Sequence, residues 1–211
     1  MVSERDRILK LSEYVESLGL VVNIGKNKAR GNKGFFTVKS EKFRIDLSKD
    51  LSDAEALRVL VHEFSHYIHY KNDMTLKSLK FLNAEIDNVL MEELISITVN
   101  LIPKETVKPL FDLRETLKKE IKTLQNQKSS MFMQFELQSR QKKLNSINRK
   151  ISKINRYYNS ITELFARSME CFMLKTEEFK LQAPNLHKVY LNYVKTDSEI
   201  SNFIFLLKNE K

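Results

Sequence analysis

The chain has 211 residues and a formal net charge of +9, with 42% hydrophobic and 30% charged residues. This length and balance predict one soluble globular domain, with or without an elaboration, and no apolar run is long enough to span a bilayer. The single cysteine excludes an internal disulfide. Together with a charged N-terminus that lacks the apolar core of a signal peptide, it predicts a cytoplasmic protein without a membrane partner. Four glycines and three prolines predict a mostly helical fold.

The first fifty residues predict a helix followed by a small sheet. Apolar residues at helical spacing favour a helix over residues 4–18. The segment LVVNI at 20–24 predicts a strand, and residues 25–34, rich in Gly, Asn and Lys, predict a loop. Residues 34–48 predict two strands around a turn near Ser40-Glu41.

A capping box formed by Ser52 and Glu55 predicts the start of the next helix. One face of this helix is apolar and is expected to enter the core; it consists of Leu57, Leu60, Val61, Phe64 and Ile68.

The same helix carries a metal-binding motif. Residues 59–70 read VLVHEFSHYIHY, in which His62, Glu63 and His66 fit the pattern H-E-x-x-H. Positions i and i+4 share one face of a helix, so both imidazoles can bind one ion. Glu63 lies on the adjoining face, where it can hold a water molecule, accept its proton as general base and pass the proton to a leaving amine.

The ligand types favour Zn²⁺, and they also accept other divalent ions. Two histidines of the core or surface without any metal are the alternative interpretation of the motif. His69 is interpreted as exposed or as support for a ligand, and His187 as structural.

The motif supplies two ligands, and two glutamates are candidates for the third. Glu93 lies in the middle of the apolar face of a helix predicted over residues 84–102, where a lone carboxylate is unfavourable unless it is paired or binds a metal. Glu163 lies in a polar stripe with Arg167 and Glu170 on a later helix. An ion pair in the core is the alternative role for Glu93, and a charged face in water is the alternative for Glu163. From the periodicity alone, Glu93 is the better candidate.

A basic helical hairpin is predicted between these two glutamates. Leucine and isoleucine recur at steps of three and four residues over 110–124 and again over 137–158, with a break near 125–130. Residues 110–157 hold twelve basic and four acidic side chains, so nearly all of the net charge is local. This surplus is typical of a solvated helix face, and it also fits an acidic partner or nucleic acid. A helix over about 160–175 and one or two shorter helices are predicted to follow.

Residues 157–170, YYNSITELFARSME, resemble a Y-[YW]-x-S-x-x-E-L-F-A-R-x-x-E segment of zincin-like metallopeptidase domains. These domains occur in the large polyvalent proteins of phages and mobile elements, and a related E-x-F-A motif occurs in peptidases of the anthrax lethal factor type. In these families the first Glu of the segment is the third zinc ligand, which maps onto Glu163. A Tyr upstream can assist as an electrophile, which maps onto Tyr157 or its neighbour Tyr158. The resemblance makes Glu163 the preferred third ligand and implies zinc-dependent peptide hydrolysis.

The first hundred residues resemble the ImmA/IrrE metallopeptidases. The shared features are a leading helix, a strand hairpin, the H-E-x-x-H helix and a later glutamate-bearing helix, which here ends in LIPKE at 101–105. In that family the third ligand maps onto Glu93. The usual Glu-x-x-Ala-Asn signature is absent, and Glu93-Leu94-Ile95-Ser96 only approximates it. Neither resemblance covers the hairpin.

Together these features predict an α+β, mainly helical, zincin-like domain of the gluzincin type over residues 1–211. It would combine a small twisted sheet, the H-E-x-x-H helix and the basic hairpin, 105–157, as an insertion. The expected function is a zinc metallopeptidase that acts on an intracellular protein or peptide, which the strand Phe43–Leu47 aligns. The alternative is a zincin-fold binding module with little or no hydrolysis, whose hairpin binds nucleic acid or a partner protein. A helical protein with an accidental motif is the third hypothesis.

Overall fold

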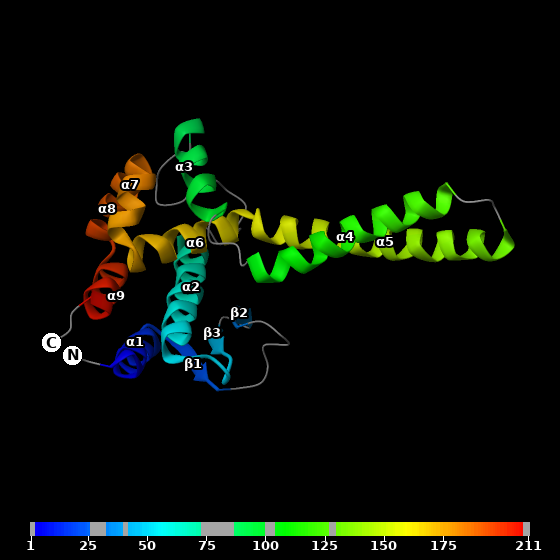
Figure 1. Cartoon of the computed structure of the whole chain (residues 1–211). Coiled ribbons are helices and arrows are strands. Elements are labelled where there is room, and N and C mark those ends of the chain that lie inside the picture. Colours follow the sequence, from blue (N-terminus) through cyan, green and yellow to red (C-terminus); the bar gives the residue numbers. More distant parts are fainter. Residues whose placement is uncertain are drawn as a thin grey trace. The chain divides into compact units, whose positions relative to one another are not determined.

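The computed structural model describes residues 3–25, 33–39, 42–72, 87–99, 104–126 and 130–208 (Figure 1). The chain divides into two compact units. The first unit combines Met1–Asn100 with Ile161–Lys211, and the second unit is Leu101–Ser160. The limits of the second unit differ by only three or four residues from those predicted for the helical insertion, 105–157.

The first unit has an α+β fold made mostly of helices, as the scarcity of Gly and Pro predicted. Its elements are α1 (Glu4–Ser17), β1 (Leu20–Ile24), β2 (Gly34–Lys39), β3 (Lys42–Leu47), α2 (Asp53–Asn72), α3 (Asn88–Val99), α6 (Ile161–Leu174), α7 (Thr176–Gln182), α8 (Pro184–Thr196) and α9 (Ser198–Lys208). Three helices follow α6, where one or two were expected. The predicted helix over 84–102 corresponds to α3, and residues 84–86 and 100–102 of that prediction lie outside the described part.

None of the helices in the described part combines the length and the apolar character that crossing a membrane requires.

Local signals in the sequence set the ends of the first two helices. Ser3 caps α1, because its hydroxyl accepts a hydrogen bond from the backbone N–H of Asp6 at 3.1 Å. Beyond its other end, Gly19 adopts a φ of +89°, a conformation that side chains with a Cβ rarely reach. The predicted capping box begins α2: the backbone N–H of Glu55 donates to the Ser52 hydroxyl, and the Ser52 N–H donates to the Glu55 carboxylate.

The sheet has three strands in the order β1-β3-β2. The central strand β3 pairs in parallel with β1 and antiparallel with β2, so both of its edges take part in a ladder. The prediction that Phe43–Leu47 aligns a substrate is therefore wrong, because a strand paired on both sides has no free backbone groups for a further strand. The edge strand that packs on α2 is β2.

Helix α2 lies at the centre of the first unit and packs against α6, which crosses it (Figure 1). Its predicted apolar face is buried throughout: Leu57, Leu60, Val61, Phe64 and Ile68. Phe64 also stacks on Phe203 of α9, with ring centroids 4.0 Å apart. Burial of each large apolar side chain contributes about 1.5–3 kcal/mol, so this face holds the rest of α2 in a fixed orientation.

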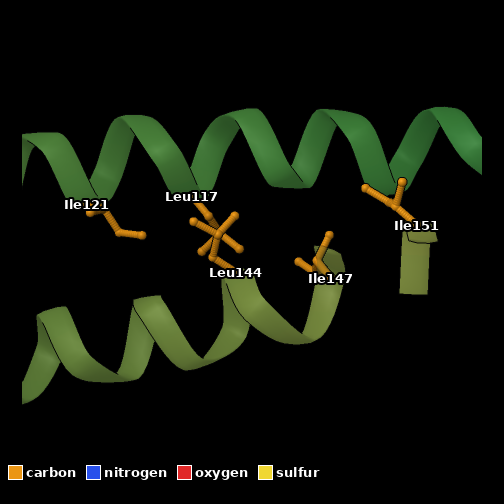
Figure 2. Close-up of a cluster of buried hydrophobic side chains, with 5 residues drawn as sticks. All are labelled: Leu117, Ile121, Leu144, Ile147 and Ile151. Atoms are coloured by element: carbon orange, nitrogen blue, oxygen red, sulfur yellow. The ribbon is translucent and has the colours of Figure 1, made fainter. Parts of the chain in front are cut away.

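The second unit is a helical hairpin with a core of its own. Helices α4 (Lys104–Gln125) and α5 (Met131–Tyr158) run antiparallel, as predicted, and enclose a cluster of buried side chains (Figure 2). The cluster consists of Leu117, Ile121, Leu144, Ile147 and Ile151. An ion pair between Arg140 and Glu120, at 2.8 Å, joins the two helices beside this cluster.

Candidate metal centre

The packing of α2 against α6 brings His62 and His66 next to Glu163. His66 Nε2 lies 3.3 Å from Glu163 Oε1, and His62 Nε2 lies 3.7 Å from Glu163 Oε2. One ligand atom from each of the three residues lies within 4.8 Å of the other two. The two imidazole rings are nearly perpendicular, at 88°. The fold therefore joins two motif histidines to a glutamate that lies 97 residues beyond His66 (163 − 66 = 97).

These separations fit one shared ion better than they fit hydrogen bonds. Ligand atoms at about 2.0–2.1 Å from a tetrahedral ion lie about 3.3–3.4 Å from one another. The distance from His66 to Glu163 equals this value, and the distance from His62 to Glu163, 3.7 Å, exceeds it slightly. A charge-assisted N–H···O bond is about 2.7–2.9 Å long, shorter than either distance. Two imidazoles and one carboxylate also form a donor set that divalent transition metals accept. His62, His66 and Glu163 therefore form a candidate metal centre.

A second carboxylate from α6 holds the other ring nitrogen of His62. His62 Nδ1 lies 3.0 Å from Glu170 Oε2, which leaves Nε2 directed at Glu163. Arg58 Nε donates to the opposite oxygen of Glu170 at 2.5 Å. Such a carboxylate fixes the tautomer and the orientation of a ligating histidine. The sequence placed Glu170 in a polar stripe without a role, although its spacing of two helical turns from Glu163 was a usable signal.

The polar stripe of α6 faces the protein interior. Glu163, Arg167 and Glu170 are each no more than 5% exposed, so the alternative of a charged face in water is excluded. Arg167 Nη2 donates to Glu163 Oε2 at 3.1 Å. This contact compensates the charge of a carboxylate that would be unfavourable in the interior by itself.

Glu63 lies between the candidate metal centre and the edge strand of the sheet. Its side chain is 6% exposed, and the backbone N–H of Phe36 in β2 lies close enough to lower the pKa of its carboxyl. Gly34 permits this approach: a Cβ there would lie 2.4 Å from a methyl group of Val59 and 3.3 Å from Glu63 Oε1. Any side chain at this position would push β2 away from α2, a requirement that no local pattern in the sequence reveals.

The acidic groups change the protonation of this region. Burial raises the pKa of Glu63; His62, His66 and the Phe36 N–H oppose that shift, and Glu163 adds to it. Burial alone would lower the pKa of His62, but the hydrogen bond to Glu170 and the surrounding carboxylates outweigh it and raise the pKa. Burial would raise the pKa of Glu170, but His62 and Arg58 outweigh it and lower the pKa. Carboxylates that surround two imidazoles favour a cation, whether a proton or a metal ion.

The other candidate ligand, Glu93, has a different role. Its carboxylate accepts hydrogen bonds from the backbone N–H of Leu186 and from the Asn185 side chain, both at 2.8 Å. It thereby caps α8, whose own N-cap residue, Ala183, offers no side-chain acceptor. Among the described residues, Glu93 belongs to no group that could hold a metal ion.

Three other residues considered in the sequence analysis are not part of the candidate metal centre among the described residues. Tyr157 ends α5 in the second unit, is 55% exposed and contacts Tyr158 ring to ring, so its role as electrophile stays a prediction. His69 is fully buried and stacks on Phe165, which excludes the exposed alternative of its prediction. His187 is buried beside Phe172, and burial lowers its pKa, which agrees with a structural role.

No family model matches the sequence, and comparisons with curated proteins and with solved structures found no match either.

Proposed function

We propose that the protein is a zinc-dependent metallopeptidase of the gluzincin type. The observation that carries the proposal is the convergence of His62, His66 and Glu163, with ligand atoms within 4.8 Å of one another, beside the buried Glu63. Structural zinc sites usually have four protein ligands, whereas three leave a position for water or substrate. A carboxylate next to that position has a use in hydrolysis and none in a purely structural site.

Each side chain of the candidate centre has its own role in the proposed reaction. His62, His66 and Glu163 would hold the zinc ion, which supplies Lewis acidity when bound. Glu63 accepts the proton of the attacking water and returns it to the leaving amine. The raised pKa of Glu63 makes its carboxylate a stronger base. Glu170 orients His62.

The outer edge of β2, which pairs with no strand among the described residues, is the proposed surface for an extended peptide. The backbone N–H of Ser48 donates to the C=O of Lys33, and ladder bonds recur at every second pair from there, so the pair Phe36–Ile45 lacks them. Gly34 and Val38 have the same orientation in the strand, so their backbone N–H and C=O groups point away from β3. A peptide that adds to this edge as a further strand lies beside the Glu63 carboxylate.

Metal analysis combined with peptide hydrolysis tests the proposal. The wild-type protein should hold about one zinc ion per chain, and Glu163→Ala should lose it because two histidines alone bind zinc weakly. Glu63→Gln should keep the zinc but cleave a mixed peptide library at least about 100-fold more slowly, because it cannot accept the proton.

The matched control is Glu177→Gln, which removes an exposed carboxylate of α7 and should change neither quantity. A wild-type protein that binds no zinc when zinc is supplied contradicts the metal centre. Zinc binding with hydrolysis that is equally fast in Glu63→Gln contradicts the role of Glu63 and leaves the metal centre standing.

A further inference from the structure

One face of α5 carries exposed side chains along most of the helix. At about 100° per residue, seven of them fall within a strip about 60° wide, on the side opposite the buried cluster. All seven are exposed: Met131, Phe135, Gln138, Lys142, Arg149, Lys153 and Arg156. At about 1.5 Å per residue, this α5 strip is about 37 Å long.

The charge of the second unit is concentrated on this helix. α5 holds seven basic residues and one acidic residue, Glu136, a balance of +6 (7 − 1 = 6). Arg140 pairs with Glu136 and Glu120. None of the other six cations of α5 makes an ion pair within the described part of the chain, whereas α4 pairs two of its cations with Glu115. The positive charge of the α5 strip is therefore available to a partner.

The N-terminal end of the strip is apolar. Met131 is 90% exposed and Phe135 is 77% exposed, and Phe132 beside them is 76% exposed. Between this end and Arg156 the exposed uncharged residues are hydrogen-bonding ones, among them Gln138, Asn145 and Ser146. The surface thus combines aromatic rings, a line of cations and polar groups, without an acidic side chain in the strip.

We infer that the α5 strip binds single-stranded nucleic acid. The cations neutralise successive phosphates, the amide and hydroxyl groups contact sugars and base edges, and Phe132 and Phe135 stack on unpaired bases. Aromatic rings beside a basic track are the combination by which proteins bind single strands without sequence preference. A duplex would leave the two rings unused, because its bases are already stacked.

An anionic membrane fits the same surface poorly. If the apolar end entered a bilayer, Lys142 would lie about 10 Å from Phe135 along the helix and the other three cations about 21 Å or more, all beyond the screening length of about 8 Å. If the helix lay flat, the strip from Gln138 to Arg156 would offer no apolar side chain to the lipid.

An acidic protein partner is also less suited. Stable protein interfaces have a largely apolar core, and the basic part of the strip contains no apolar residue over about 27 Å. A phosphate backbone needs no such core, because release of its counterions drives binding.

Fluorescence anisotropy with the 211-residue chain and labelled oligothymidylate tests the inference. If the four cations of the strip neutralise four phosphates, the salt slope is about −2.8, and affinity falls roughly 50-fold between 50 and 200 mM NaCl. Lys142→Gln, Arg149→Gln, Lys153→Gln and Arg156→Gln combined should remove this binding.

The matched control removes the same charge elsewhere. Lys10, Lys180, Lys188 and Lys195 are exposed residues of the first unit, and their combined change to Gln should leave affinity within about twofold. A second variant, Phe132→Ala with Phe135→Ala, should weaken binding at least about tenfold without changing the salt slope. Both residues are exposed, so the helix should keep its fold, which circular dichroism checks.

Several outcomes would overturn the inference. Equal losses in the two charge variants would mean unspecific attraction to a basic protein. Tighter binding of a duplex than of the single strand, or full binding without the two phenylalanines, would exclude base stacking. Displacement of the strand by equal concentrations of polyglutamate would favour an acidic protein, and stronger binding to phosphatidylserine vesicles than to the strand would favour a membrane.

Discussion

Glu170 acts on the candidate metal centre through His62. It holds His62 Nδ1 at 3.0 Å and is itself held by Arg58. Glu170→Ala should therefore weaken zinc affinity about 10- to 100-fold, because the ring loses its fixed orientation. Glu170→Gln should weaken it less, because the amide oxygen can still accept a hydrogen bond from Nδ1. A competition titration with a chelator measures both affinities.

The charge of Glu170 has a separate effect that a merely structural role would not produce. Glu170 contributes to the raised pKa of His62, so Glu170→Gln should lower that pKa in the protein freed of metal. An NMR titration of the His62 ring measures the shift, with Glu177→Gln as the control. An unchanged pKa together with lower stability would mean that Glu170 only supports packing.

At the residue scale, the sequence identified the ligands partly by spacing and partly by resemblance. His62, Glu63 and His66 follow from helix geometry alone. Glu163 could not be identified in this way. The periodicity of α6 predicts a polar stripe, but it does not show that α2 packs against that stripe. Glu93 was favoured by its apolar neighbours, although its carboxylate caps another helix, a contact between residues 92 positions apart that no local pattern reveals.

At the scale of elements, the cap on α8 gives the next prediction. Glu93→Ala should destabilise the protein by about 1 kcal/mol, because α8 has no capping side chain of its own. Its zinc content should stay that of the wild type. Urea denaturation and metal analysis on the same samples measure the two quantities.

Glu92→Ala is the matched control, since Glu92 is the exposed neighbour on the same helix. It should leave stability within about 0.5 kcal/mol. Loss of zinc from Glu93→Ala, with zinc retained in Glu163→Ala, would instead assign the third ligand to α3.

The helices and strands themselves were largely readable from the sequence, but the order of strands was not. Residues 34–48 form the predicted pair of antiparallel strands. β1 then joins β3 in parallel and turns β3 into the central strand, so the sheet's outer strands are β1 and β2. Strand order depends on how α1 and the following chain pack, which the alternation of side chains within one strand does not encode.

At the scale of the whole molecule, the two units have separate cores. Ile147→Ala should destabilise the hairpin by about 2 kcal/mol or more, because Ile147 is buried in the cluster between α4 and α5. The zinc content of the protein should not change, since all ligands belong to the first unit. Circular dichroism in urea and metal analysis measure these effects.

Ser146→Ala, at the exposed neighbouring position, should change neither property. If Ile147→Ala loses its zinc, the stability of the first unit depends on the hairpin. The prediction that the two cores are independent would then be wrong.

The distance of Glu163 from the motif along the chain sets the order in which the centre is assembled during synthesis. His62 and His66 leave the ribosome first, and the whole hairpin is made before Glu163 follows, 97 residues after His66 (163 − 66 = 97). At about 5–20 residues per second, this takes about 5–20 s. During that time the growing chain has Glu63 and two of the three candidate ligands. The candidate centre therefore cannot bind a metal through all three residues until Glu163 has been made.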